Sequence, residues 1–271
     1  EKTVTEIGQK RGEAEMKKQI VRIGTLSLGE GMPKVCVPVM GKEARALEKA
    51  AAQADQAELI ELRLDSVSPE MRQDVLREAC AAVRKAGKPV LATMRTMRDG
   101  GAGECDAEKY EALLDMLVRE RLCDAVDVEL SIGDTAFVRI ADRAHAEGIP
   151  VVGSYHDFAA TPTVKEMAAR LQRMAALGAD ICKIAVMPHS RKDVVALTAA
   201  SVQADDELAQ PVIAIAMGLV VFILRELLPM NRLWTLVEVL VGIAVYIGIA
   251  LLVKAITPED LRSFRRGNKK H

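Results

Sequence analysis

One lysine in an apolar segment poses the sharpest chemical question in this chain. Lys183 lies in GADICKIAVMP (178–188), where apolar residues on both sides predict a buried strand. Removing an ammonium group from water costs several kcal/mol unless a partner compensates for it. A neutral lysine amine, by contrast, can attack a ketone and form a Schiff base, whose iminium withdraws electrons from the adjacent C–H bond. Lys183 is therefore a surface lysine whose amine reaches water, half of an ion pair, or a nucleophile.

Polar side chains also stand near the carboxyl ends of four other apolar runs. They are Glu61, Arg63 and Asp65 in ELRLD, Thr93 and Arg95 in LATMR, Asp127 and Glu129 in DVEL, and His156 in SYHDF. Alternate side chains of a strand share a face, so each set is expected on one face of its strand. An open sheet would bury these groups against helices at a large cost, whereas a barrel lets them converge at the end where barrels hold active sites.

The residue types at this end of the predicted barrel suit proton transfer next to a Schiff base. Histidine titrates near neutral pH, so His156 suits a general base beside the iminium of Lys183. We expect burial, together with Arg63 and Arg95, to favour the neutral amine of Lys183. Asp127, Glu129 and His156 could in principle hold a metal, but no HExxH motif is present and we expect none. From the residues alone, both a Schiff-base lyase and a class I aldolase remain open.

The elements that must position these residues repeat along the chain. Strand-like runs begin near residues 34, 58, 89, 124, 149, 180 and 211, and helical patterns separate them. One helix is expected to start at Ser68-Pro69 and to end at Gly87. Such alternation predicts a parallel sheet covered by helices, either an open doubly wound sheet or a TIM-type (β/α)8 barrel. The polar faces favour the barrel, without its last β/α unit. Residues 18–33 are expected to form a hairpin that caps one end.

Composition bounds the class of protein. The chain has 271 residues, 50% hydrophobic and 28% charged, with only 3% aromatic residues and a net charge of −1. This composition suits an α/β enzyme and argues against a nucleic-acid partner. Five scattered cysteines without a CxxC motif predict free thiols and a cytoplasmic barrel. We expect three segments: an extension or linker (1–17), the barrel (18–218) and a hydrophobic helical tail (219–271).

The strand motifs resemble those of one family, the type I 3-dehydroquinate dehydratases of the shikimate pathway. In order, the motifs are GEGMPKVCVPVMGK, ELRLD, TMR, DVEL, YHDF and GADICKIAVMP, and the resemblance covers about residues 18–218. It implies dehydration of 3-dehydroquinate to 3-dehydroshikimate, a step towards the aromatic amino acids. It also implies that no metal or organic cofactor is needed, and that the protein is a homodimer, as family members commonly are.

The same resemblance implies a role for each site residue. Lys183 would form the imine with the substrate ketone, and His156 would remove a proton and help the hydroxyl leave as water. Glu61 and Arg63 would contact substrate hydroxyls, and Arg95 would make another substrate contact. Asp99 stands where many family members have a glutamate, and is expected to bind substrate with a shorter reach.

The C-terminal tail is a different kind of sequence. The resemblance stops at PVIAIAMG (211–218), before the arginine that would bind the substrate carboxylate and before an eighth strand. Residues 233–253 form a 21-residue run with one charged residue, long enough to span a bilayer. The segment AITPEDLRSFRRGNKK resembles the C-terminus of polysaccharide flippases. A non-catalytic chimera with a membrane-associated tail is therefore the main alternative to an active dehydratase.

Overall fold

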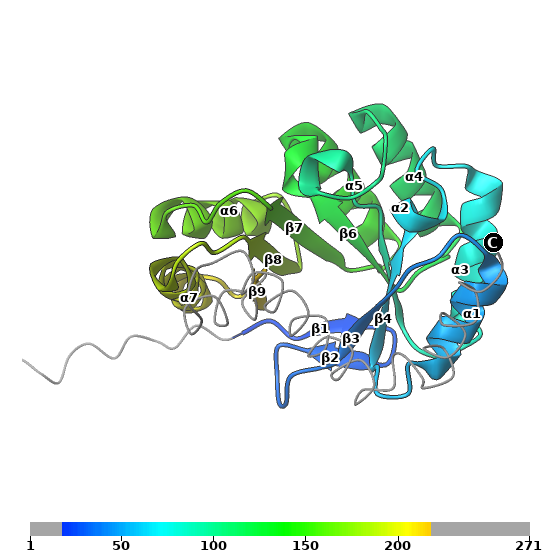
Figure 1. Ribbon diagram of the computed structural model, residues 1–271, viewed down its shortest axis with the longest axis horizontal. Helices are drawn as coiled ribbons and strands as arrows, with labels where there is room; N and C mark the ends of the chain where they lie inside the picture. Colours follow the sequence, from blue (N-terminus) through cyan, green and yellow to red (C-terminus); the bar gives the residue numbers. More distant parts are fainter. Residues whose placement is uncertain (1–17, 218–271) are drawn as a thin grey trace, which may run out of the picture.

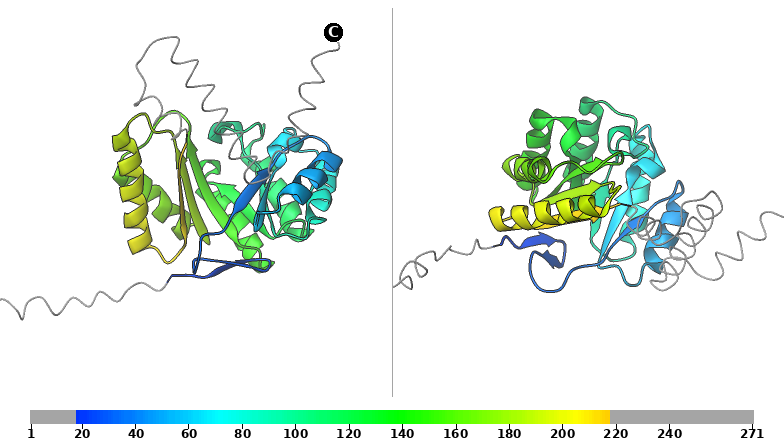
Figure 2. Two further views of the ribbon diagram at one scale, coloured as in Figure 1. Left: turned by 60° about the horizontal axis from the view of Figure 1, so that its bottom comes forward. Right: turned by 60° about the vertical axis from the view of Figure 1, so that its left-hand side comes forward.

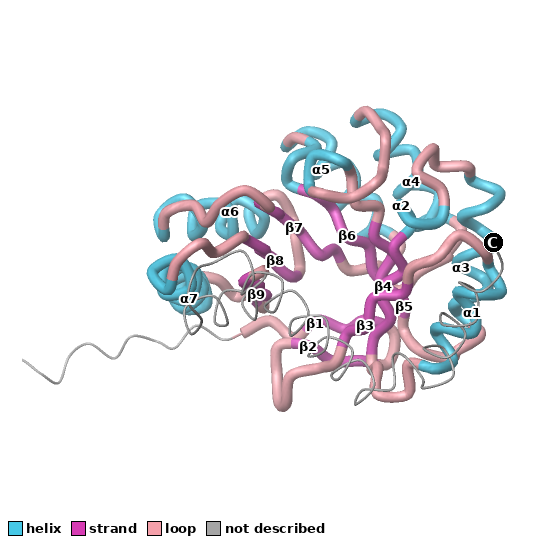
Figure 3. Tube along the Cα trace, viewed as in Figure 1, coloured by secondary structure: helices cyan, strands magenta, loops and turns pink. Residues whose placement is uncertain are grey.

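A computed structural model describes residues 18–217 of the chain; the predicted extension (1–17) and the predicted tail (219–271) lie outside the described residues. Seven parallel strands, paired in chain order, form one curved sheet (Figures 1 and 3). They are β3 Cys36–Val39, β4 Leu59–Arg63, β5 Val90–Thr93, β6 Ala125–Glu129, β7 Val151–Asp157, β8 Ile181–Val186 and β9 Val212–Ala216. These strands confirm the seven predicted from the sequence.

Helices connect the strands and cover the outer face of the sheet (Figure 1). The long ones are α1 Ala44–Gln53, α3 Gln73–Arg84, α4 Ala107–Arg119, α5 Asp134–Ala146, α6 Val164–Ala176 and α7 Arg191–Glu207. A doubly wound sheet would reverse its strand order at a switch point, whereas here the order follows the chain. The fold is thus a partial TIM-type barrel, and within residues 18–217 its edge strands β3 and β9 each pair on one side only.

The alternation of side chains gives the barrel wall two apolar surfaces. Outward positions such as Ile60, Leu62, Val126 and Ile184 pack with the helices in the larger core. At Gly153, on the outward face of β7, a Cβ atom would lie 2.8 Å from the Cβ atom of Ala179 and 3.1 Å from that of Met174. The absence of a side chain there lets the helical layer approach the strand closely.

A hairpin closes the amino-terminal end of the strands, as the sequence predicted. β1 Val21–Ile23 and β2 Leu26–Leu28 pair antiparallel beneath the sheet (Figure 2). Their buried residues meet the first inward side chain of five strands. We call this cluster the apolar floor: Val21, Ile23, Leu59, Leu91, Ala125, Val152 and Ile181.

One helix boundary differs from the sequence prediction. Ser68-Pro69 does not begin the helix; a short helix α2 (Leu64–Val67) ends there, and α3 begins at Gln73. Met71 has a φ of 60°, in the left-handed region, which interrupts any helix through this segment. The Ser68 hydroxyl accepts a hydrogen bond from the backbone N–H of Arg72, four residues on, so it stabilises the intervening turn instead.

Among residues 18–217, no helix is long and apolar enough to cross a membrane. The predicted transmembrane run at 233–253 and the flippase-like segment lie outside the described residues.

Candidate active site

Lys183 points from β8 into the barrel, where carboxylates surround its amine. Its side chain is 12% exposed, and its Nζ atom lies 3.6 Å from Glu61 Oε1 and 3.6 Å from Asp127 Oδ2. The three residues come from β4, β6 and β8, alternate strands whose inward side chains meet near the barrel axis. The structure thus places two carboxylates beside the amine, which the expectation based on Arg63 and Arg95 did not include.

Arg95 shares Asp127 with Lys183 and forms ion pairs with two buried carboxylates. Its Nη2 donates to Asp127 Oδ2 at 2.9 Å, and its Nη1 donates to Glu129 Oε1 at 2.9 Å. Nη1 also donates to the Ser154 hydroxyl at 2.9 Å. Arg95 is only 4% exposed, and both carboxylates are fully buried. Both terminal nitrogens of this guanidinium are therefore engaged within the protein.

Two hydroxyl groups complete this network: that of Thr93, which the sequence analysis named, and that of Ser154, which it did not. Ser154 Oγ donates to Asp127 Oδ1 at 2.6 Å, and Thr93 Oγ1 donates to Glu61 Oε1 at 2.9 Å. We call the second inward position of the five strands the charged layer: Glu61, Thr93, Asp127, Ser154 and Lys183. Each stands two residues after a residue of the apolar floor. That spacing was visible in the sequence and could have identified Ser154.

A second group of hydroxyls holds the other buried carboxylate and the end of β6. Thr96 binds Glu129 through both its backbone N–H, at 2.8 Å, and its hydroxyl, at 2.6 Å. The buried Tyr110 hydroxyl donates to the backbone carbonyl of Asp127 and accepts from the backbone N–H of Glu129, both at 3.2 Å. These bonds fix the backbone that carries both carboxylates.

The two buried carboxylates have opposite pKa shifts. Burial alone would raise the pKa of Asp127, but Arg95, Lys183, His156 and the Ser154 hydroxyl together hold that pKa at about 2. For Glu129, burial dominates and raises the pKa to about 7, although Arg95 and Thr96 oppose it. Asp127 therefore stays ionised near neutral pH, whereas Glu129 titrates there.

His156 lies on β7, two residues beyond the register partner of Lys183. Lys183 pairs with Ser154, so His156 is on the same inward face, one pleat nearer the carboxyl end. Burial lowers the pKa of His156, and Asp99 opposes this shift. Asp99 Oδ2 lies 3.3 Å from His156 Nδ1 and accepts the backbone N–H of His156 at 3.2 Å. The imidazole is thus neutral near pH 7 and is held by a carboxylate.

The 3₁₀ turn Met97–Asp99 positions this carboxylate and ends at Gly100. Gly100 has a φ of 78°, and a Cβ atom there would lie 2.2 Å from the ring of Phe158. That ring stacks on the imidazole of His156, with centroids 6.4 Å apart. A glycine at this position therefore lets Phe158 cover the histidine.

Arg63 forms a separate ion pair at the carboxyl end of β4. Its Nε and Nη2 donate to the two oxygens of Asp65, each at 2.8 Å, and its side chain is 22% exposed. Asp65 also accepts the backbone N–H groups of Ala102 and Arg95. Arg63 is therefore more accessible than Arg95 and is oriented by a buried carboxylate.

The acidic and histidine side chains do not form a metal cluster in the described part of the chain. No group of three or more His, Cys, Asp or Glu residues has suitable geometry within residues 18–217. Asp127 and Glu129, which were possible ligands, bind Arg95 instead.

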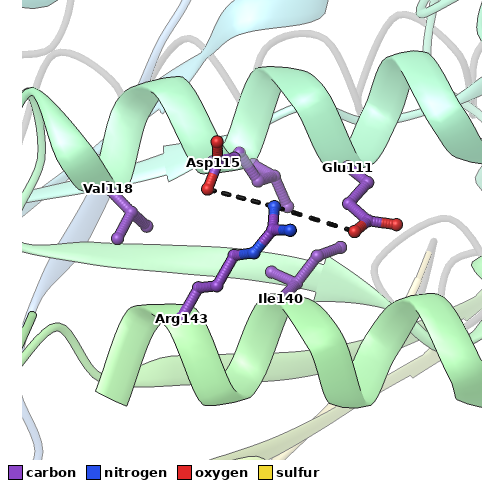
Figure 4. A pocket seen from close by; sticks show the side chains of 6 residues that line it. Glu111, Asp115, Val118, Ile140 and Arg143 are labelled. Atoms are coloured by element: carbon purple, nitrogen blue, oxygen red, sulfur yellow. Dashed lines mark ion pairs between the residues drawn. The ribbon is translucent and has the colours of Figure 1, made fainter. Parts of the chain in front are cut away.

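A small pocket between α4 and α5 also contains charged groups, but these neutralise one another. Arg143 lies 3.1 Å from Asp115 and 3.7 Å from Glu111 (Figure 4). Leu114, Val118 and Ile140 complete the lining. This pocket is a helix–helix contact rather than a second site.

Buried charged side chains at the carboxyl ends of the strands of a TIM-type barrel are the arrangement in which TIM-barrel enzymes hold their active sites. The family model for type I 3-dehydroquinase matches residues 35–225. The 3-dehydroquinate dehydratase of Neisseria gonorrhoeae is 38% identical over 196 residues, which cover 70% of this chain and 77% of that protein. The protein of the same name from Bacillus licheniformis is 34% identical over 206 residues, 74% of this chain and 81% of the relative.

Solved structures agree with this assignment. The type I 3-dehydroquinate dehydratase of Clostridium difficile superimposes with a TM-score of 0.71 at 34% identity, covering 74% of this chain and 81% of that one. The 3-dehydroquinate dehydratase of Geobacillus kaustophilus also gives 0.71, at 29% identity, with 75% and 81% covered. The chain belongs to the type I 3-dehydroquinase family. Its reaction is the dehydration of 3-dehydroquinate in the shikimate pathway, which decides against the aldolase alternative.

Proposed function

We propose that Lys183 forms a Schiff base with the ketone of 3-dehydroquinate and that His156 is the base. The observation that carries this proposal is the position of both groups on one inward face. Lys183 Nζ is 12% exposed among carboxylates, and His156 stands one pleat above the register partner of Lys183. The Clostridium difficile structure is described as carrying covalently modified comenic acid, which supports a covalent route in this family.

The proposed steps balance without a cofactor. Lys183 Nζ attacks the ketone carbon, and the carbonyl oxygen leaves as water, which gives an iminium. His156 removes a proton from the carbon next to the iminium carbon, and the electron pair moves into an enamine. The enamine expels the hydroxyl from the following carbon, which takes a proton from His156 and leaves as a second water. Water then hydrolyses the iminium and releases the unsaturated ketone and the free amine.

Among the residues expected to bind substrate, the geometry favours those nearest the mouth of the barrel. We propose that Glu61 and Arg63, both partly exposed, contact substrate hydroxyls. Asp99 acts through His156, which it touches directly. Arg95 was expected to contact substrate, but its burial and its three side-chain partners instead favour a role in holding Asp127 and Glu129.

Borohydride trapping tests the proposed nucleophile. Sodium borohydride added with 3-dehydroquinate should reduce the iminium and leave a stable ligand mass on the peptide that contains Lys183. Lys183→Met should carry no adduct, and Lys165→Met, an exposed lysine of α6, should be labelled like the unmodified chain. Absence of an adduct in the unmodified protein, with a folded circular dichroism spectrum, rejects the proposal.

Three broader expectations stay proposals about the whole chain. The five free thiols support a reducing, cytoplasmic location. The apolar run at 233–253 motivates membrane association of the tail, and family resemblance motivates a homodimer. Flotation with lipid vesicles tests membrane association, and light scattering in detergent tests whether the protein is a homodimer. A chain that floats with vesicles and forms no Lys183 adduct would match the non-catalytic chimera.

A further inference from the structure

Asp127 occupies the most constrained position of the charged layer, although no substrate role was expected for it. It is fully buried on β6, and its Oδ2 atom faces Lys183 Nζ at 3.6 Å and Arg95 Nη2 at 2.9 Å. Its Oδ1 atom accepts the Ser154 hydroxyl at 2.6 Å. Both oxygens are thus held by groups from the segment after β5, from β7 and from β8, so the carboxylate stays directed at the lysine.

We propose that Asp127 is the fixed counter-ion of Lys183, positioned by Ser154 and Arg95 to stabilise the positive charge of the iminium. This inference rests on the proposed role of Lys183 as nucleophile. The amine loses and regains its charge during the cycle, and the iminium carries the charge while the C–H bond breaks. A carboxylate fixed beforehand stabilises that charge without reorganising during the reaction.

None of the other charged or titratable groups around Lys183 and Asp127 can take the place of Asp127 as the counter-ion. Those that face Lys183 or Asp127 are Cys36 from β3, Glu61 from β4, Arg95 after β5, Glu129 from β6, His156 from β7 and Tyr110 from α4. Burial raises the pKa of Tyr110 well above its usual value, and the pKa of the Cys36 thiol is raised to about 12, so neither group is charged near neutral pH.

Glu61 is the nearest competitor, because it lies at the same distance from the amine. However, its side chain is 15% exposed and Thr93 is its one side-chain hydrogen-bond donor within the described residues. Asp127 is fully buried, and water screens a buried charge less than an exposed one. Asp127 therefore acts more strongly on Lys183 than Glu61 does.

The test compares the pH dependence of adduct formation in Asp127→Asn and in the unmodified enzyme. Initial rates of borohydride trapping with 3-dehydroquinate are measured from pH 5 to pH 9, alongside kcat and KM. Without the carboxylate, the protonated amine loses its stabilising partner while Arg95 remains, so the pH of half-maximal trapping should fall by about one unit or more. kcat should fall about a hundredfold and KM should change little, because the iminium loses its counter-ion.

Two further variants separate positioning from a structural defect. Ser154→Ala keeps the charge of Asp127 but frees its Oδ1 atom; it should leave the trapping pH unchanged and lower kcat about three- to tenfold. Asp124→Asn alters a carboxylate just before β6 that accepts the Val90 backbone N–H and pairs with Arg84. It should leave both the trapping pH and kcat unchanged.

Each result decides between the two proposals. If the unmodified enzyme forms no adduct, the nucleophile proposal fails and this inference falls with it. If it forms the adduct and Asp127→Asn, folded by circular dichroism, traps with the same pH dependence, the counter-ion inference alone is overturned. If Asp127→Asn does not fold, Ser154→Ala decides, and an unchanged kcat in that variant overturns the inference.

Discussion

Within the barrel, the apolar floor and the charged layer lie two residues apart on the same five strands. The floor residue Ile181 is followed by Lys183 in the layer above, and Ala125 is followed by Asp127. The two remaining floor residues, Val21 and Ile23, come from the hairpin. Burial of carbon in the floor supplies stability, whereas the layer above contains charges whose burial costs free energy unless each one is paired. On each of the five strands, the residue that contributes to stability and the residue of the charged layer are thus neighbouring inward positions, two residues apart.

Replacement of the lysine should produce the largest effect and the clearest separation of the two regions. Lys183→Met should lower kcat by about ten-thousandfold or more, because no other amine occupies the layer. The free energy of unfolding should fall by no more than about 1 kcal/mol, because Asp127 keeps its ion pair with Arg95 and the partly exposed Glu61 keeps its hydrogen bond from Thr93. Steady-state kinetics and urea unfolding measure the two quantities. A large loss of stability would show that the charged layer also supports the fold.

A substitution in the apolar floor should have the reverse outcome. Ile23 is fully buried under the strands, so Ile23→Ala should lower the free energy of unfolding by about 2–4 kcal/mol. kcat of the folded protein should stay within about twofold, because no floor residue touches the proposed reacting groups. Ile20→Ala is the matched control, since Ile20 precedes the same hairpin and is 47% exposed. Its unfolding curve should match that of the unmodified protein.

The titration of Glu129 links the charged layer to stability in a specific pH window. Its raised pKa, about 7 against an ordinary 4.5, means that the folded state binds this proton more tightly than the unfolded chain does. Stability from this group is therefore complete below about pH 4.5 and is lost as the pH rises to about 7. Between pH 5 and pH 8, the free energy of unfolding of Glu129→Gln should therefore fall by about 2–3 kcal/mol less than that of the unmodified protein.

Urea unfolding at both pH values measures that difference. Glu120→Gln is the control, because Arg77 holds the pKa of this surface carboxyl below its usual range. Its stability should follow the unmodified curve between the two pH values. A Glu129→Gln curve with the same pH dependence would contradict the raised pKa.

The smallest expected effect lies outside both regions. Thr163 and Ser190 begin α6 and α7 with capping boxes, so Thr163→Ala and Ser190→Ala should each cost about 1 kcal/mol without changing kcat. Thr198→Ala, in the exposed middle of α7, should change stability by less than about 0.5 kcal/mol. Thermal unfolding of the three variants measures the contribution of the outer helices. A change in kcat would mean that the helix starts help to position the charged layer.

Much of this arrangement was predictable, because it follows from the two-residue period of strands. That period predicted the inward face of Lys183, His156 and Asp127. The alternation of strands and helices left an open sheet and a barrel possible, and the polar inward faces favoured the barrel, whose strands follow the order of the chain. The partners within the site were not predictable from one strand at a time. Lys183 is in register with Ser154 on the adjacent strand, yet its amine faces Asp127 and Glu61 from alternate strands, because the tilt of the strands brings the inward side chains of alternate strands together.

The start of α3 shows a second limit. Ser68-Pro69 is a sound helix-start signal, but the left-handed backbone of Met71 depends on packing that no local pattern records. Arg95 shows a third limit. Its residue type suits a substrate anion, and only the three-dimensional structure reveals that its nitrogens bind internal carboxylates.

The tight packing at Gly153 has a consequence for how variants of this chain would be classified. Even a methyl group there would meet Ala179 and Met174, so the strand that carries Ser154 and His156 would have to shift. In a screen scored by growth without aromatic supplements, Gly153→Ala would resemble a substitution of His156, the proposed base, although the new methyl group lies on the outer side of β7. Packing between the helical layer and β7 therefore constrains the positions of the side chains on the inward face of that strand. Loss of activity alone would not distinguish a substitution behind β7 from one in the site.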